Sequence, residues 1–107
     1  MACNFKYYSE EDIFYISRED IFGEIFSSLP VGNFVFDVDD SGKIVSLGID
    51  NASEVFGVSS DKIKAKSANL GTTIQGNMLL IHFVIDLGIK IYNFSYVFPR
   101  NKISLIA

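Results

Sequence analysis

The feature that most constrains this chain is an acidic turn between two apolar segments, at residues 35–45 (VFDVDDSGKIV). Apolar side chains alternate before the turn, at Phe34, Phe36 and Val38, and β-branched residues resume after it. Gly42 supplies the residue that can take a positive φ in a tight turn. The segment therefore predicts a β-hairpin, and with it a pair of antiparallel strands.

The same residues also begin like a calcium-binding loop. Such a loop needs oxygen ligands at its first, third and fifth positions, a glycine at the sixth and a bidentate Glu at the twelfth. Asp37, Asp39, Ser41 and Gly42 meet the first four requirements, but the twelfth position is Gly48, which has no side chain. We therefore favour the hairpin over a metal loop, and we expect no metal or other cofactor.

Short apolar segments separated by turn residues run through the rest of the chain. Strands are predicted at residues 5–8, 13–16, 33–39, 43–49, 72–75, 78–86, 89–98 and 103–106. Residues 21–29 fit either a helical stripe or a strand, and short helices are predicted at 51–56 and 61–68. Tight turns imply antiparallel neighbours, because parallel strands need long crossovers. The expected fold is a single domain, residues 1–107, of the α+β class: mainly an antiparallel β-sheet meander, with one or two short helices in mid-chain covering one face.

Composition and cysteine content predict a soluble cytoplasmic protein. Half of the residues are hydrophobic, so the chain can bury a core. The longest apolar run, residues 78–85, contains a histidine and is far shorter than the roughly 20 residues that span a membrane. The N-terminus lacks a signal-peptide core. The single cysteine, Cys3, cannot form an internal disulfide and has no activating neighbours that would indicate a catalytic thiol.

Charge is unevenly distributed along the chain. Residues 1–57 hold eleven acidic and three basic side chains, whereas residues 58–107 hold two acidic and six basic ones. An acidic face and a basic face could meet in an oligomer. The alternative is that both halves share one fold with mixed surface charge. We favour this alternative, because halves of a sequence need not be halves in space.

Three spaced patterns lie in the first half of the chain. They are Tyr7-x-x-Glu10-x-Asp12-x-x-Tyr15-Ile16, Asp37-x-Asp39-x-x-Gly42-x-Ile44-Val45 and Ile49-x-Asn51-Ala52-Ser53. In order and spacing this half, residues 5–56, resembles a family of short, uncharacterised prokaryotic proteins, a domain of unknown function. The resemblance implies a small β-rich module with strand at residues 21–26, and it brings no established activity or site residue. Gly48 is a departure, because the family often has Ile-Glu-Ile where this chain has Leu-Gly-Ile.

His82 is the only histidine, and strand alternation places it on one face with Leu80 and Val84. A histidine can act as an acid or a base. With no second histidine and a distant lone cysteine, the sequence does not indicate a zinc site. No nucleophile or orienting partner lies near it in the sequence, so a structural role is favoured.

A row of alternating side chains in residues 90–98 is the sharper candidate for a binding surface. Lys90, Tyr92, Phe94, Tyr96 and Phe98 share one face of the predicted strand. Aromatic rows on a sheet can stack single-stranded bases. The chain is acidic overall and holds few Lys and Arg residues for a backbone binder. We therefore expect this row to fill the core, with the Tyr hydroxyls at its edge.

The remaining motifs also favour a protein without catalytic chemistry. Glu10, Glu11 and Asp12 cluster in a predicted turn, where acidic residues are common for reasons of solvation. No phosphate-binding loop or dinucleotide glycine motif is present in the sequence. The sequence therefore favours a non-catalytic binding or assembly module that self-associates. Tyr92, Phe94, Tyr96 and His82 are its candidate surface residues. The alternatives are a small enzyme or ligand-binding protein with a pocket between sheet and helices, and, third, a single-stranded nucleic-acid binder. We expect no membrane partner.

Overall fold

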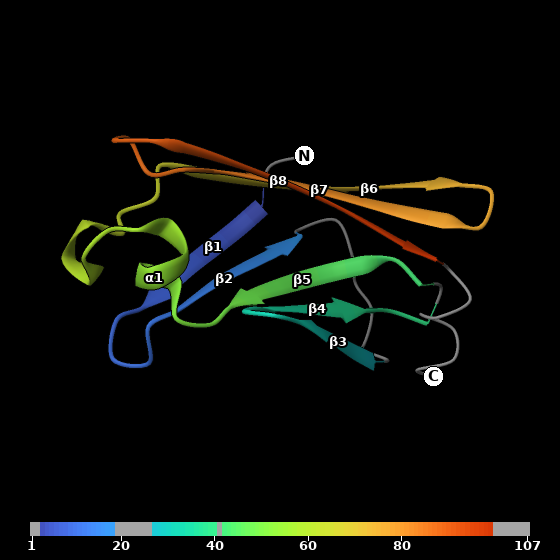
Figure 1. Cartoon of the computed structure of the whole chain (residues 1–107), viewed down its shortest axis with the longest axis horizontal. Helices are drawn as coiled ribbons and strands as arrows, with labels where there is room; N and C mark the ends of the chain where they lie inside the picture. The colour runs from blue at the N-terminus through green and yellow to red at the C-terminus, as the bar shows by residue number, and fades with distance from the viewer. Residues whose placement is uncertain (1–2, 19–26, 41, 100–107) are drawn as a thin grey trace.

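The computed structural model describes residues 3–18, 27–40 and 42–99, and within them the strands form two antiparallel sheets (Figure 1). The first sheet has five strands in the order β1-β2-β5-β4-β3, namely β1 (Cys3–Tyr8), β2 (Ile13–Arg18), β5 (Ile44–Ile49), β4 (Phe34–Val38) and β3 (Ser27–Val31). The second has three strands in the order β6-β7-β8, namely β6 (Ser67–Gln75), β7 (Met78–Asp86) and β8 (Ile91–Pro99). Helix α1 (Ala52–Phe56) and the 3-10 turn η1 (Ser60–Lys62) connect the two sheets at one end.

The two sheets pack against each other as the layers of a sandwich (Figure 1). The predicted antiparallel sheet and short mid-chain helix are confirmed, but the fold is closer to all-β than to α+β. The helix predicted at 61–68 is wrong, because only Ser60–Lys62 forms a helical turn and β6 begins at Ser67. A helix of five residues is too short to cover a sheet, so the second sheet buries the apolar face of the first.

Strand alternation places the apolar side chains of the five-stranded sheet on one face. Phe14, Ile49 and Phe34 stand side by side across β2, β5 and β4. Ile16, Leu47 and Phe36 form the next row, and all six side chains are buried. The opposite face carries the polar and half-exposed residues, as expected for a sheet with one face on the core.

The three-stranded sheet meets this layer through aromatic rings. The ring of Phe34 lies 5.6 Å from that of Phe83 on β7 and 5.4 Å from that of Phe94 on β8, between centroids. Phe36 lies 5.6 Å from Phe98. Edge-to-face contacts at these separations are favourable, and such rings bury the largest apolar areas in a core of this size. The aromatic contacts also show that β8 packs on β4.

The acidic hairpin forms as predicted. Gly42 adopts a φ of 85°, its amide donates to the Asp39 carbonyl at 3.1 Å, and the Asp39 amide donates to the Lys43 carbonyl at 2.9 Å. The Lys43 amide also donates to a carboxylate oxygen of Asp39, at 3.0 Å. These bonds close the turn.

The carboxylate of Asp37, the first candidate ligand of the metal loop, is held on the outer face of the sheet. Ser28 donates to its Oδ1 at 2.6 Å and Ser46 to its Oδ2 at 2.7 Å, each from the neighbouring strand. The row Ser28–Asp37–Ser46 therefore joins β3, β4 and β5 by side chains as well as by backbone. These hydrogen bonds give the Asp37 carboxylate a structural role in the sheet.

The other predicted hairpin, around Gly76, is also confirmed. Gln75 pairs with Met78, which leaves a two-residue turn in which Gly76 has a φ of 58°. In the ambiguous segment 21–29, the last three residues belong to strand β3. Residues 21–26 and the predicted strand at 103–106 lie outside the described residues.

Substitution Gly42→Ala should lower the free energy of unfolding by about 1 kcal/mol, because an L side chain at this positive φ is strained although the space around its Cβ is open. Gly71→Ala is the matched control, since its Cβ would meet only the His82 carbonyl, at 3.9 Å, and its φ is negative. Urea denaturation of the two variants measures the difference. Equal stability of Gly42→Ala and the unsubstituted protein would contradict the assigned turn.

Candidate functional site

The aromatic row predicted from the sequence lies on the inner face of β8. Tyr92, Phe94 and Tyr96 are half-buried and pack on the core, and the Tyr92 hydroxyl donates to the Phe56 carbonyl at 2.5 Å. The rings therefore point between the sheets. They do not form a flat exposed platform of the kind that stacks bases.

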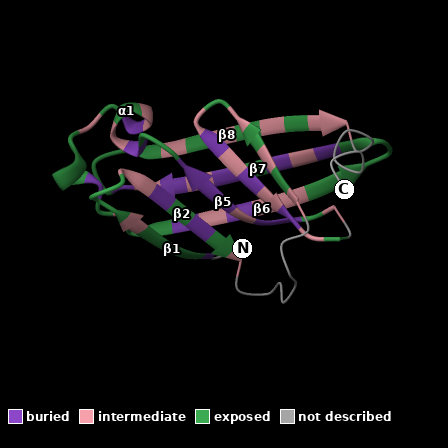
Figure 2. Ribbon diagram, turned by 90° about the horizontal axis from the view of Figure 1, so that it is seen from below, coloured by how far each residue is buried: buried purple, intermediate pink, exposed green. Residues whose placement is uncertain are grey.

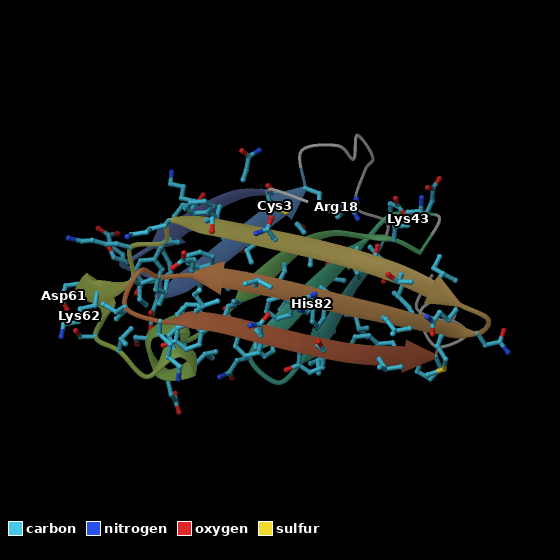
Figure 3. All side chains as sticks on the ribbon, turned by 90° about the horizontal axis from the view of Figure 1, so that it is seen from above. Cys3, Arg18, Lys43, Asp61, Lys62 and His82 are labelled. Carbon is cyan, nitrogen blue, oxygen red and sulfur yellow. The ribbon has the colours of Figure 1, made fainter. Side chains whose placement is uncertain are left out.

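His82 lies on the opposite face, near the middle of the outer surface of the three-stranded sheet (Figure 3). It is exposed, and its Nε2 lies 3.4 Å from Oδ1 of Asn93 on the neighbouring strand. The two kinds of candidate residue are thus separated by the sheet itself. Within the described residues, no group of three or more metal-ligating side chains is brought together.

A cluster that the sequence analysis missed lies at the α1 end of the sandwich. Asp12 is at the end of the β1–β2 turn with a φ of 55°, and its carboxylate accepts from the Tyr7 hydroxyl at 2.5 Å. The Ser53 amide donates to Oδ1 at 3.0 Å and the Ser53 hydroxyl to Oδ2 at 2.6 Å. The Ala52 amide donates to the Asp12 carbonyl at 2.9 Å. Asp12 therefore holds the first turn of α1 against the β1–β2 hairpin.

These contacts shift the pKa values of both acids in the cluster. Burial, together with the hydrogen bond to Asp12 and its negative charge, raises the pKa of Tyr7 from 10.0 to about 12. Burial alone would raise the pKa of Asp12, but the hydrogen bonds from Ser53 and Tyr7 outweigh it and hold that pKa below its usual value. Both carboxylate oxygens of Asp12 accept hydrogen bonds, which fits a structural role better than that of a general base. We call the hydrogen bonds of Asp12 with Tyr7 and Ser53 the latch.

The outer face of the five-stranded sheet carries a second small cluster. The Tyr15 ring covers Gly48 on the neighbouring strand, where an added Cβ would come within 3.2 Å of the ring. Tyr8 meets Tyr15 edge-on at 5.7 Å, and the Lys6 ammonium lies 4.9 Å from the Tyr8 ring centre. The space beside Gly48, where the family often has a glutamate, is thus occupied by the Tyr15 ring from β2. A ring that covers a strand glycine supports the sheet without any ligand.

Strand β8 is an edge strand that is exposed along much of its length. No residue of β8 is buried, and half-buried and exposed side chains alternate along most of its length (Figure 2). Among the described residues, β8 is the last strand of its sheet, so one of its edges has no strand beside it. An unpaired edge presents backbone N–H and C=O groups that can pair with another strand.

A ledge of the other sheet runs beside this edge. The rings of β8 pack on Phe34 and Phe36 of β4, and strand β3 extends the five-stranded sheet one strand further. Leu29 and Val31 of β3 share the inner face with those rings but are only half-buried. We call these two residues the β3 ledge. The ledge and the β8 edge together outline the space that one more strand would fill.

The two sequence halves of opposite charge correspond largely to the two layers of the sandwich. The five-stranded sheet lies within residues 3–49 and the three-stranded sheet within residues 67–99. Arg18 bridges the layers, with its Nη1 3.4 Å from Oγ1 of Thr72 on β6 (Figure 3). The two halves therefore pack as two layers around one core.

Comparisons of the chain with protein-family models, curated proteins and solved structures found no match. The resemblance of residues 5–56 to a prokaryotic family therefore stays a prediction. Within the described residues, no helix is long and apolar enough to cross a membrane.

Substitution Asp12→Ala should lower the free energy of unfolding by about 1–2 kcal/mol, because it removes hydrogen bonds to a charged group that is only partly buried. Asp50→Ala, at an exposed position near the same end, is the matched control. Chemical denaturation at pH 7 measures both. An Asp12→Ala variant as stable as the control would contradict the latch.

The same cluster predicts two pH limits. The pKa of Asp12 is lower in the folded protein than in the unfolded chain. Its contribution to the free energy of unfolding is therefore present above the unfolded pKa and is lost as the pH falls through the folded pKa. Tyr7 has a raised pKa, so its contribution is complete below pH 10.0 and is lost as the pH rises towards about 12. Tyr7→Phe should remove much of the loss of stability at alkaline pH. The melting temperature measured against pH tests this. An unchanged alkaline limb would show that Tyr7 is not its source.

Proposed function

We propose that this protein is a non-catalytic binding and assembly module that binds by accepting an additional strand at the outer edge of β8. The observation that carries the proposal is the combination of a long uncharged edge strand with the β3 ledge beside it. Strand addition gains affinity from backbone hydrogen bonds and specificity from alternate side chains. We place the module in the cytoplasm, on the basis of its single cysteine.

The composition of β8 supports this role. The strand has nine residues and none of them is charged. The most exposed large hydrophobic residues of the described chain lie on it or just before it: Ile89 is 64% exposed, Ile91 58% and Val97 56%. Natural proteins usually protect a long edge with charges, proline or a covering element, because bare edges attract other strands. The apolar exposure of β8 therefore favours a binding surface.

The other sheet edges are better protected. β3 is five residues long and contains Pro30, and β1 is six residues long and carries Lys6. Strand β6 packs against β1 and β2 of the other sheet. Its outward-facing residues are mainly polar: Ser67, Asn69, Gly71, Thr73 and Gln75. The contrast favours β8 over the other edges as the proposed pairing edge.

A strand added to β8 would also improve the packing of the core. Neighbouring strands lie about 4.8 Å apart and packed sheets about 10 Å apart, so the added strand would run above β3. It would cover the β3 ledge together with the open sides of Phe94 and Phe98, which are half-buried. Removing this apolar surface from water would favour the complex.

The alternatives receive less support from the same residues. An enzyme or ligand-binding site would draw His82 and carboxylates together, but His82 contacts Asn93 on an exposed sheet face. The carboxylate of Asp12 is engaged by the latch. A nucleic-acid platform would need exposed rings, and those of β8 turn inward. These placements favour assembly over both alternatives.

Substitution Val97→Lys should abolish self-association, because a lysine on an edge strand opposes pairing with another strand. Thr73→Lys, exposed on the opposite edge strand, is the matched control and should associate like the unsubstituted protein. Sedimentation velocity over a concentration series measures the mass, and circular dichroism checks the fold of each variant. A protein that stays monomeric at every concentration, or Val97→Lys that associates normally, would contradict the proposal.

A further inference from the structure

The symmetry of an antiparallel pair limits which strand suits the edge of β8. Two copies of one strand can pair about a two-fold axis, and each residue then faces a fixed residue of the second copy. Any charge near the axis would face a like charge, and like charges directly opposite are destabilising. β8 has no charged residue between Ile91 and Pro99, so a two-fold axis can cross it without this penalty.

The position of the axis follows from the residues that it would place opposite each other. An axis through Ser95, the central residue, would set Ile91 opposite Pro99 of the second copy, and a proline has no N–H to donate across the contact. An axis through Phe94 sets Lys90 opposite the second copy's Phe98, and a cation beside an aromatic ring is favourable. The missing donor therefore favours the axis at Phe94.

The axis at Phe94 also pairs the exposed apolar residues with each other. It places Ile91 opposite the second copy's Val97, and these are the two most exposed large hydrophobic residues of the strand. On the inner face it places Tyr92 opposite Tyr96 and Phe94 opposite its own copy. Aromatic and aliphatic cross-strand pairs are among those that stabilise antiparallel sheets.

The two ends of β8 lie at opposite ends of the molecule. Tyr92 contacts Phe56 at 4.9 Å, so β8 begins beside α1. Phe98 packs on Phe36 at 5.6 Å, so β8 ends near the turn between β4 and β5 (Figure 1). A two-fold axis through the middle of β8 therefore brings the α1 end of one copy to the β4–β5 end of the other.

Basic and acidic side chains lie at these two ends. At the beginning of β8, Lys66 lies close to Gly88, whose added Cβ would be 2.9 Å from the Lys66 Cε, and the Lys90 ammonium lies 5.1 Å from the Tyr92 ring centre. The β4–β5 turn at the other end carries Asp39 and Asp40, together with Lys43. The two-fold arrangement thus brings lysines towards aspartates twice, once at each end of the contact.

We infer that the strand accepted by β8 is β8 of a second copy of this chain, paired antiparallel about an axis at Phe94 and flanked by Lys90–Asp40 attraction at both ends. This inference rests on the proposed function and names its partner. It joins two three-stranded sheets into one continuous sheet across the dimer. Opposite charges at the rim add orientation and association rate to the apolar contact.

A charge exchange tests the orientation of the two copies. Lys90→Asp and Asp40→Lys should each weaken dimerisation by about fivefold, the effect of an exposed ion pair, and the double variant should restore it. Sedimentation equilibrium at 0.1 M salt measures the dissociation constant. At 1 M salt the differences should shrink, because screening shortens the Debye length to about 3 Å. If the double variant is weaker than either single variant, the orientation is wrong.

Disulfide trapping tests the register. In a Cys3→Ala background, a mixture of Asn93→Cys and Ser95→Cys chains should form the mixed disulfide under mild oxidation, because these residues face each other about the axis at Phe94. Efficient cross-linking of Ser95→Cys alone would move the axis to Ser95 and overturn the inference. In either case, loss of association in Val97→Lys would still support the proposed function. Association in which neither register is trapped and Val97→Lys has no effect would contradict both.

A shortened chain tests the main competing occupant, which is the chain's own C-terminal segment. The chain ending at Pro99 should dimerise as the full chain does. If dimerisation appears only after residues 100–107 are removed, that segment competes for the edge and the second copy is not the natural occupant. A full chain that is monomeric, with a shortened chain that is also monomeric, would contradict self-association outright.

Discussion

The structure depends on one constraint: three strands must cover a sheet of five. β6 packs on β1 and β2, and the rings of β8 pack on β4, which leaves β3 one strand further out. The side chains of the five-stranded sheet below the three-stranded sheet are fully buried, as Phe36, Leu47 and Ile16 are, whereas Leu29 and Val31 remain half-buried. The incomplete cover leaves the β3 ledge and the inward-facing rings of β8 half-buried. It also explains why the proposed binding surface is an edge and not a pocket.

The other end of the sandwich is closed by a helix that could not persist alone. Isolated helices shorter than about 12 residues are marginal in water, and α1 has five. Asp12 compensates by binding Ser53, and Tyr92 binds the carbonyl of Phe56 at the other end of the helix. The start of β8 is therefore held against α1, while one edge of the strand has no described strand beside it. This contact with α1 fixes the position and direction of the edge.

Local turn chemistry could be predicted from the sequence, and the pairing of the layers could not. Gly42 and Gly76 sit between alternating apolar residues, and both hairpins form. The second predicted helix, at 61–68, was wrong because its last residues, Ser67 and Ala68, pair with Asp86 and Ile85 of a strand that follows later. Asp12 was predicted as an ordinary turn carboxylate, since no local pattern reveals that Ser53 lies opposite it. The only sequence signal was that Asp12 and Ala52-Ser53 occur in the same set of spaced patterns.

Residue type alone could not show whether Tyr92, Phe94 and Tyr96 form a binding surface. The same alternating row would be exposed if β8 turned its other face towards the core.

The measurement that tests the account most directly is amide hydrogen exchange in β8 at several protein concentrations. Within the described residues, the outward-facing amides of β8 have no strand to pair with, so they should exchange quickly at low concentration. If the edge accepts a second strand, the exchange of these alternate amides should slow as the concentration rises, while β7 amides, already paired on both sides, should not change. Exchange of the β8 amides that is the same at the lowest and the highest concentration would contradict the account.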